Sequence, residues 1–156
     1  MKYFVLENDE RNVMPRVINW YQTVNPQYLC MEKYEKLPPK VILDMKLGNN
    51  YVYTDIITNP FFMVSEEAGQ VMFMYDKRLQ FITAILLDVN NKDQAVYYIP
   101  VLPRVESLSK SAIGNLVVFK LEDAIKSKIF IRIDLAESLL ERGAKGICLK
   151  EAFVLK

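Results

Sequence analysis

The sequence predicts an α+β fold: a single domain over residues 1–156 in which two or more helices pack on a mixed or mostly antiparallel sheet. The length of 156 residues suffices for one hydrophobic core and argues against two independent ones. Stretches of strand length, rich in β-branched and aromatic residues, recur along the chain. Two other segments have the apolar spacing of amphipathic helices.

The N-terminal part begins with a short strand and continues irregularly. Residues 3–6 are aromatic or β-branched and end at a polar turn, which indicates a strand. Residues 13–40 contain four prolines and the only tryptophan of the chain. Because proline cannot continue a helix or a central strand, no long regular element is expected there.

Residues 41–47 alternate in the manner of a half-buried strand. Val41, Leu43, Met45 and Leu47 share one face, and Asp44 and Lys46 lie on the other. Residues 48–50 form a turn, after which residues 51–53 are expected to return as the partner strand.

Residues 65–76 are the first predicted helix, with Ser65 as its N-cap and two glutamates in the first turn. Its buried stripe consists of Ala68, Val71, Met72 and Tyr75. Residues 81–88 and 95–102 follow as a β-hairpin, with Pro100 at the end of the second strand or at a sheet edge.

In the last third of the chain, the sequence predicts strands over residues 116–121 and 128–133 and then a helix capped by Asp134. Glu137 completes a capping-box pattern with Asp134. Gly143 occupies the position of a left-handed C-cap residue, and a closing strand begins near Gly146.

Two segments, 61–88 and 129–153, resemble each other, since both run from an apolar strand through a capped helix to a second strand. A weak internal duplication is one interpretation of this likeness. The alternative is that any strand–cap–helix unit shows the same pattern.

The composition excludes several classes of function. The chain has no histidine, which removes histidine acid–base catalysis and most familiar zinc sites. With 20 basic and 19 acidic residues the net charge is +1, so no nucleic-acid partner is expected. Glycine-rich phosphate loops and CxxC pairs are absent from the sequence, so no cofactor and no metal are expected.

The chain is expected to be cytoplasmic and not to contact a membrane. Its N-terminus lacks the apolar core of a signal peptide, and its apolar runs are far shorter than a membrane span. Cys30 and Cys148 are then expected to be small buried thiols rather than a disulfide.

Several short motifs, over roughly residues 51–153 and the first strand, resemble a bacterial polymorphic-toxin immunity family. They are Met1–Leu6, Asp55-Ile56-Ile57, Val64-Ser65-Glu66, the Tyr-Tyr strand of residues 97–101, Ser111, Ile129-Phe130, and the helix and Gly-aliphatic strand of residues 139–149. The resemblance implies a protein that binds a cognate toxin domain and blocks it sterically, without catalysis.

The partner-binding residues predicted from the sequence are Arg16, Trp20, Tyr21 and Tyr28, because interface centres are enriched in aromatic and arginine side chains. The alternative for Trp20 is a core position under a long loop. Two other functions stay open: a regulatory module that binds another protein, and a histidine-free enzyme that uses Asp, Glu or Lys in a polar, acid-lined cleft.

Overall fold

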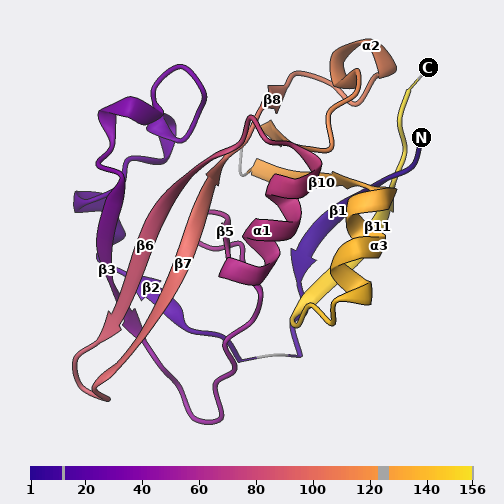
Figure 1. Cartoon of the computed structure of the whole chain (residues 1–156). Coiled ribbons are helices and arrows are strands. Elements are labelled where there is room, and N and C mark those ends of the chain that lie inside the picture. Colours follow the sequence, from indigo (N-terminus) through magenta and orange to yellow (C-terminus); the bar gives the residue numbers. More distant parts are fainter. Residues whose placement is uncertain (12, 123–126, 156) are drawn as a thin grey trace.

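The computed structural model describes residues 1–11, 13–122 and 127–155 and arranges them around two β-sheets (Figure 1). The strands are β1 (Tyr3–Asn8), β2 (Arg16–Ile18), β3 (Lys40–Lys46), β4 (Ile56–Ile57), β5 (Met63–Val64), β6 (Gln80–Asp88), β7 (Asp93–Val101), β8 (Arg104–Val105), β9 (Val118–Glu122), β10 (Ser127–Arg132) and β11 (Ile147–Ala152). The helices are α1 (Glu66–Tyr75), α2 (Lys110–Ile113) and α3 (Ile133–Glu141), with short 3₁₀ helices η1 (Trp20–Gln22), η2 (Pro26–Tyr28) and η3 (Tyr34–Lys36).

The described chain is mainly sheet with a few helices, which is compatible with the predicted α+β class. The expectation of one central sheet is wrong, because the strands divide between two. Each sheet is mostly antiparallel and contains a parallel pair, β8 with β9 in one and β3 with β6 in the other.

The first sheet has the strand order β11-β1-β10-β9-β8. β1 lies in its interior, antiparallel to β10 and to β11, so that Leu6 is opposite Ile129 on one side and Leu149 on the other. The N-terminal strand is therefore held by the last third of the chain.

The second sheet has the order β2-β3-β6-β7-β5-β4. The predicted hairpin is confirmed, since β6 and β7 pair from Gln80–Val101 to Asp88–Asp93. Pro100 is the penultimate residue of β7, which agrees with its predicted place at the strand end. The predicted alternation of β3 is also confirmed, with Val41, Leu43 and Met45 buried.

Each sheet contains a helical crossover of the same form. β5 leads through α1 to β6, and β7 lies between these two strands in the sheet. β10 leads through α3 to β11, and β1 lies between them. In both units the outer strands run antiparallel to the middle strand. The segments 61–88 and 129–153, which look alike in sequence, thus have the same topology.

The two main helices differ in how they begin. The Ser65 hydroxyl accepts a hydrogen bond from the Ala68 amide at 3.2 Å, which confirms the predicted cap of α1. The predicted cap of α3 is wrong, because the helix already begins at Ile133 and Asp134 lies in its first turn. There the Asp134 carboxylate instead accepts two hydrogen bonds from the Arg132 guanidinium, both at 2.8 Å.

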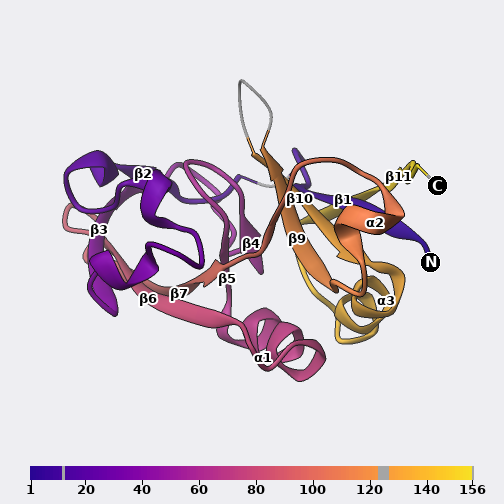
Figure 2. The ribbon, with the colours of Figure 1, turned by 90° about the horizontal axis from the view of Figure 1, so that it is seen from above.

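Three apolar clusters fill the molecule. The central one contains side chains of both sheets together with α1 and α3. The second lies between the β3-β6-β7 sheet and the segment with the three 3₁₀ helices. The third lies on the outer face of the first sheet, beside α2. Figure 2 shows α1 and the 3₁₀ segment on opposite sides of the β6–β7 hairpin.

Polar contacts also join the first sheet to the second sheet and to the segment with the 3₁₀ helices. The Asn8 side chain, at the end of β1, donates to the Ile56 carbonyl at 2.7 Å and accepts from the Thr58 amide at 2.8 Å. The buried Lys120 ammonium of β9 donates to the Leu29 carbonyl at 2.8 Å. The Asn8 bonds help to fix the position of one sheet against the other, and the Lys120 bond satisfies a buried ammonium.

Two local expectations are wrong. Residues 51–53 form no strand; the Val52 amide instead donates to the Val13 carbonyl at 2.6 Å. Cys30 is a buried free thiol, as predicted, but Cys148 is only half-buried. The reason is that β11, which carries Cys148, is the edge strand of its sheet.

Candidate functional site

The structure distributes the four residues predicted to bind a partner over two faces of the second sheet. Trp20 is half-buried and packs edge-to-face on the buried Phe61, with 5.8 Å between ring centroids. Tyr28 is also half-buried, with the Lys36 ammonium 5.3 Å from its ring centroid. Tyr21 is 65% exposed and touches Trp20 edge-to-face. These three aromatic residues lie in the segment that covers one side of the sheet.

Arg16 lies apart from them. It is an exposed residue of β2 opposite Lys46 of β3, whereas its neighbour Val17 is buried beneath the 3₁₀ segment. Because successive side chains of a strand point to opposite faces, Arg16 belongs to the uncovered side of the sheet. The predicted set is therefore not one surface.

The uncovered side of this sheet carries several exposed or half-buried apolar side chains, and we call it the open face. Its outward residues are Arg16 and Ile18 of β2, Lys40, Ile42, Asp44 and Lys46 of β3, Phe81, Thr83, Ile85 and Leu87 of β6, and Gln94, Val96 and Tyr98 of β7. Figure 2 shows that α1 flanks it on the far side of β7.

An apolar row crosses the centre of the open face. Ile42 is opposite Ile85 in the β3–β6 pairing, and Ile85 is opposite Val96 in the β6–β7 pairing. Ile42 is 58% exposed and Val96 46% exposed. Since paired strands lie about 4.8 Å apart, the three side chains form one continuous strip. Contiguous exposed apolar side chains are one of the features that mark interaction surfaces on proteins.

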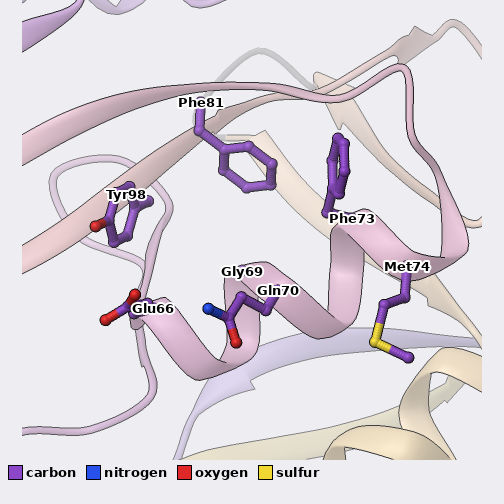
Figure 3. Close-up of a pocket in the computed structure, with 7 residues that line it drawn as sticks. All are labelled: Glu66, Gly69, Gln70, Phe73, Met74, Phe81 and Tyr98. Carbon is purple, nitrogen blue, oxygen red and sulfur yellow. The ribbon is translucent and has the colours of Figure 1, made fainter.

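A pocket of about 420 Å³ continues this strip under α1. Figure 3 shows its lining, with Phe73 of α1 and Phe81 of β6 turned toward each other and Tyr98 beside them. The ring centroids of Phe73 and Phe81 are 6.5 Å apart. Gly69 lies on the helix face that points at Phe81, where a longer side chain would fill part of the space. The pocket is lined mainly by apolar groups, and Glu66 and Gln70 lie among its lining residues.

A second, smaller hollow of about 280 Å³ adjoins the start of α1 and is more polar. Asp55, Ser65, Glu66 and Glu67 line it together with residues of β7. Both carboxylate oxygens of Asp55 are engaged, one by the Ser65 hydroxyl at 2.7 Å and one by the Lys145 amide at 2.5 Å. Ser65 in turn caps α1. These hydrogen bonds show that Asp55 and Ser65 stabilise the start of α1.

Tyr97 also lines this hollow. Its hydroxyl donates to the Thr54 carbonyl at 2.6 Å. Burial, reinforced by the charge of Asp55, raises the pKa of the Tyr97 hydroxyl above its ordinary value. The phenol is therefore neutral at physiological pH and acts as a hydrogen-bond donor.

Within residues 1–11, 13–122 and 127–155 no three His, Cys, Asp or Glu side chains converge as a metal site would require. In the same ranges no helix combines the length and the apolar character of a membrane span. No protein-family model matches the chain. No curated protein matches it either.

The sequence contains indications of the open face that do not involve the four predicted partner-binding residues. Ile42 stands on the polar side of the alternating β3 segment, between Lys40 and Asp44. Phe73 and Met74 fall outside the predicted buried stripe of α1 and are 43% and 59% exposed. An apolar side chain on a face otherwise predicted to be polar is the signal that points to this surface.

Proposed function

We propose that this chain is a toxin-neutralising binding protein that docks its partner on the open face and acts by steric block, without chemistry of its own. The observation that carries the proposal is the exposed apolar row formed by Ile42, Ile85 and Val96. The resemblance of the chain to the polymorphic-toxin immunity family supports a toxin domain as the partner. Burying this row and the adjoining pocket would remove apolar area from water, which is the main favourable term in protein association.

The hydrogen bonds of Asp55 in the polar hollow argue against this carboxylate as a general base. A histidine-free enzyme would need a carboxylate or lysine held ready for proton transfer in a cleft. The Asp55 carboxylate has both oxygens occupied by protein donors. The larger pocket is mainly apolar, which suits the insertion of a side chain better than acid–base chemistry.

The experiment is growth rescue by co-expression with the neighbouring reading frame, followed by isolation of the complex. The wild-type chain is expected to restore growth and to co-elute with the toxic partner. Ile42→Asp is the test variant, because a side chain that is 58% exposed tolerates replacement without loss of the fold. It is expected to weaken the complex by about tenfold or more, as a central interface position does.

The matched control is Leu140→Asp. Leu140 is 55% exposed and lies on α3, on the other side of the molecule from β3 (Figure 1). The control introduces the same charge at a similar exposure and is expected to bind and rescue like the wild type. Equal loss in both variants, or rescue by Ile42→Asp, contradicts the open face as the docking surface. If the product of the neighbouring reading frame is not toxic and a different protein binds the open face, the result favours the regulatory alternative instead.

A further inference from the structure

The open face has opposite charges at its two ends. Lys40 and Lys46 of β3 point outward from it, and Arg16 of β2 is opposite Lys46. Asp44 is the acidic residue among them. No ion pair joins Arg16, Lys40 or Lys46 to another of the described residues. This end of the face therefore carries cations that remain available to a partner.

The other end is acidic. Glu66 lines the apolar pocket beside Tyr98 and also the polar hollow beside Val96, so it borders the face where β7 meets α1. Glu67 lines the polar hollow as well. Both glutamates lie in the first turn of α1, where the partial positive charge of the helix N-terminus interacts favourably with acidic side chains. The apolar row of Ile42, Ile85 and Val96 separates the two charged ends.

We propose that the partner of this face carries the inverse arrangement: carboxylates opposite β2–β3, an apolar centre, and a lysine or arginine opposite the start of α1. This inference rests on the proposed function and specifies the partner that the face selects. Charge complementarity across an interface fixes register and raises the association rate, whereas like charges placed together cost several kcal/mol.

The apolar pocket defines the partner further. Its volume of about 420 Å³ and its lining by Phe73, Phe81 and Tyr98 suit one large apolar side chain. Glu66 lies at the pocket, so a basic residue next to that anchor would find a carboxylate within reach. An anchor side chain in a desolvated pocket is the usual centre of binding energy in an interface.

The test measures association kinetics with the purified product of the neighbouring reading frame, inactivated by a point mutation where it is lethal. Lys40→Glu/Lys46→Glu reverses one end of the face, and Glu66→Lys/Glu67→Lys reverses the other. Lys33→Glu/Lys36→Glu makes the same charge change in the 3₁₀ segment, on the covered side of the sheet. Circular dichroism and thermal melts confirm that each variant is folded.

Each open-face reversal is expected to lower the association rate constant at least about tenfold at about 0.05 M salt. Most of that difference is expected to vanish at about 0.5 M salt, where the Debye length of about 4–5 Å is shorter than the distances over which charges steer two proteins together. The control pair is expected to follow the wild type. Gly69→Leu, which fills the pocket, is expected to raise the dissociation rate with little effect on salt dependence.

Three outcomes overturn the inference, and they can be told apart. If a tight complex forms and its association rate is unchanged by both charge reversals, the inferred charge arrangement is wrong but the proposed function still holds. If the wild-type protein forms no complex, both the inferred charge arrangement and the proposed function are wrong. A salt-sensitive dimer of the chain alone, disrupted by Ile42→Asp, assigns the open face to a second copy of the chain.

Discussion

The hydroxyl of Ser65 donates a hydrogen bond to the carboxylate of Asp55 at 2.7 Å, so the residue that caps α1 is itself held by a second side chain. The backbone of Asp55 takes part as well, since its carbonyl accepts from the Ser65 amide at 2.8 Å and its amide donates to the Lys145 carbonyl at 2.9 Å. The other carboxylate oxygen accepts from the Lys145 amide. Asp55 thus ties the start of α1 to the loop between α3 and β11.

Removing either member of this pair is expected to destabilise the protein. Asp55→Ala should lower the free energy of unfolding by about 2 kcal/mol, because it removes hydrogen bonds to a charged acceptor. Ser65→Ala should lower it by about 1 kcal/mol through loss of the cap. The double variant should lose less than the sum, by about 0.5 kcal/mol or more, because the two side chains share one interaction.

Urea unfolding of the two single variants and the double variant measures this coupling. Asp44→Ala serves as the control, because Asp44 is an exposed carboxylate without an ion pair to another described residue. It should change the free energy of unfolding by no more than about 0.5 kcal/mol. Strict additivity of the Asp55 and Ser65 effects would show that the two residues act separately.

Replacing Gly69 and Gly143 with alanine is expected to change the free energy of unfolding in opposite directions. A Cβ at Gly69, inside α1, would meet Val64 at 3.4 Å and Phe81 at 3.7 Å, which are ordinary contact distances. Gly69→Ala should therefore stabilise the protein by about 0.5–1 kcal/mol, the difference in helix propensity. Gly143 has φ +75, and Gly143→Ala should cost about 1 kcal/mol despite the open space around it. Thermal melts of both variants decide the signs, and destabilisation by Gly69→Ala would mean that the pocket wall cannot accept a methyl group.

Local patterns predicted the elements of this fold better than its assembly. The alternation of β3, the cap at Ser65 and the β6–β7 hairpin each depend on residues close in sequence, and all three are confirmed. The division into two sheets depends on β1 pairing with strands from the last third of the chain. No local propensity encodes such a choice, because it is decided by which apolar faces can be buried together.

The four residues predicted to bind a partner show why single side chains are hard to assign to a surface from the sequence. The aromatic character of Trp20, Tyr21 and Tyr28 predicts an interface, but aromatic side chains serve equally to cover a sheet, and Trp20 packs on Phe61. Arg16 alone of that set lies on the open face, and the sequence could not show this before the β2–β3 pairing was known. Asp134 is a second such case. The sequence predicts it as a helix cap, whereas in the structure its carboxylate forms an ion pair with Arg132.

Replacing Trp20 is expected to destabilise the protein more than replacing its exposed neighbour Tyr21. Trp20→Ala should lower the free energy of unfolding by about 2 kcal/mol, below the range for fully buried tryptophans because the side chain is only half-buried. Tyr21→Ala should change it by no more than about 0.5 kcal/mol, since that ring is 65% exposed. Denaturant titrations give both values. A Trp20→Ala protein with unchanged stability and no partner binding would instead place the interface on the 3₁₀ segment.

The ion pair between Arg132 and Asp134 is expected to make stability depend on acid pH. Hydrogen bonds from the Arg132 guanidinium hold the pKa of the Asp134 carboxyl below its ordinary value in the folded protein. In the unfolded chain the pKa returns to about 3.9. The folded state thus releases this proton more readily, and the pair stabilises the protein fully above the unfolded-state pKa. Its contribution is lost as the pH falls through the lower, folded-state value.

Asp134→Asn and Arg132→Gln remove the two sides of this pair and should reduce stability at neutral pH. The difference from the wild type should shrink as the pH falls from about 5 toward about 2, because the wild type then loses the same interaction by protonation. Urea unfolding at a series of pH values measures the difference directly. Arg132→Gln should also lose the bond from Arg132 to the Asn115 carbonyl, which does not titrate, so a constant remainder is expected at low pH. A wild-type advantage over Asp134→Asn that stays constant down to the lowest pH would show that the carboxylate contributes through packing and not through its charge.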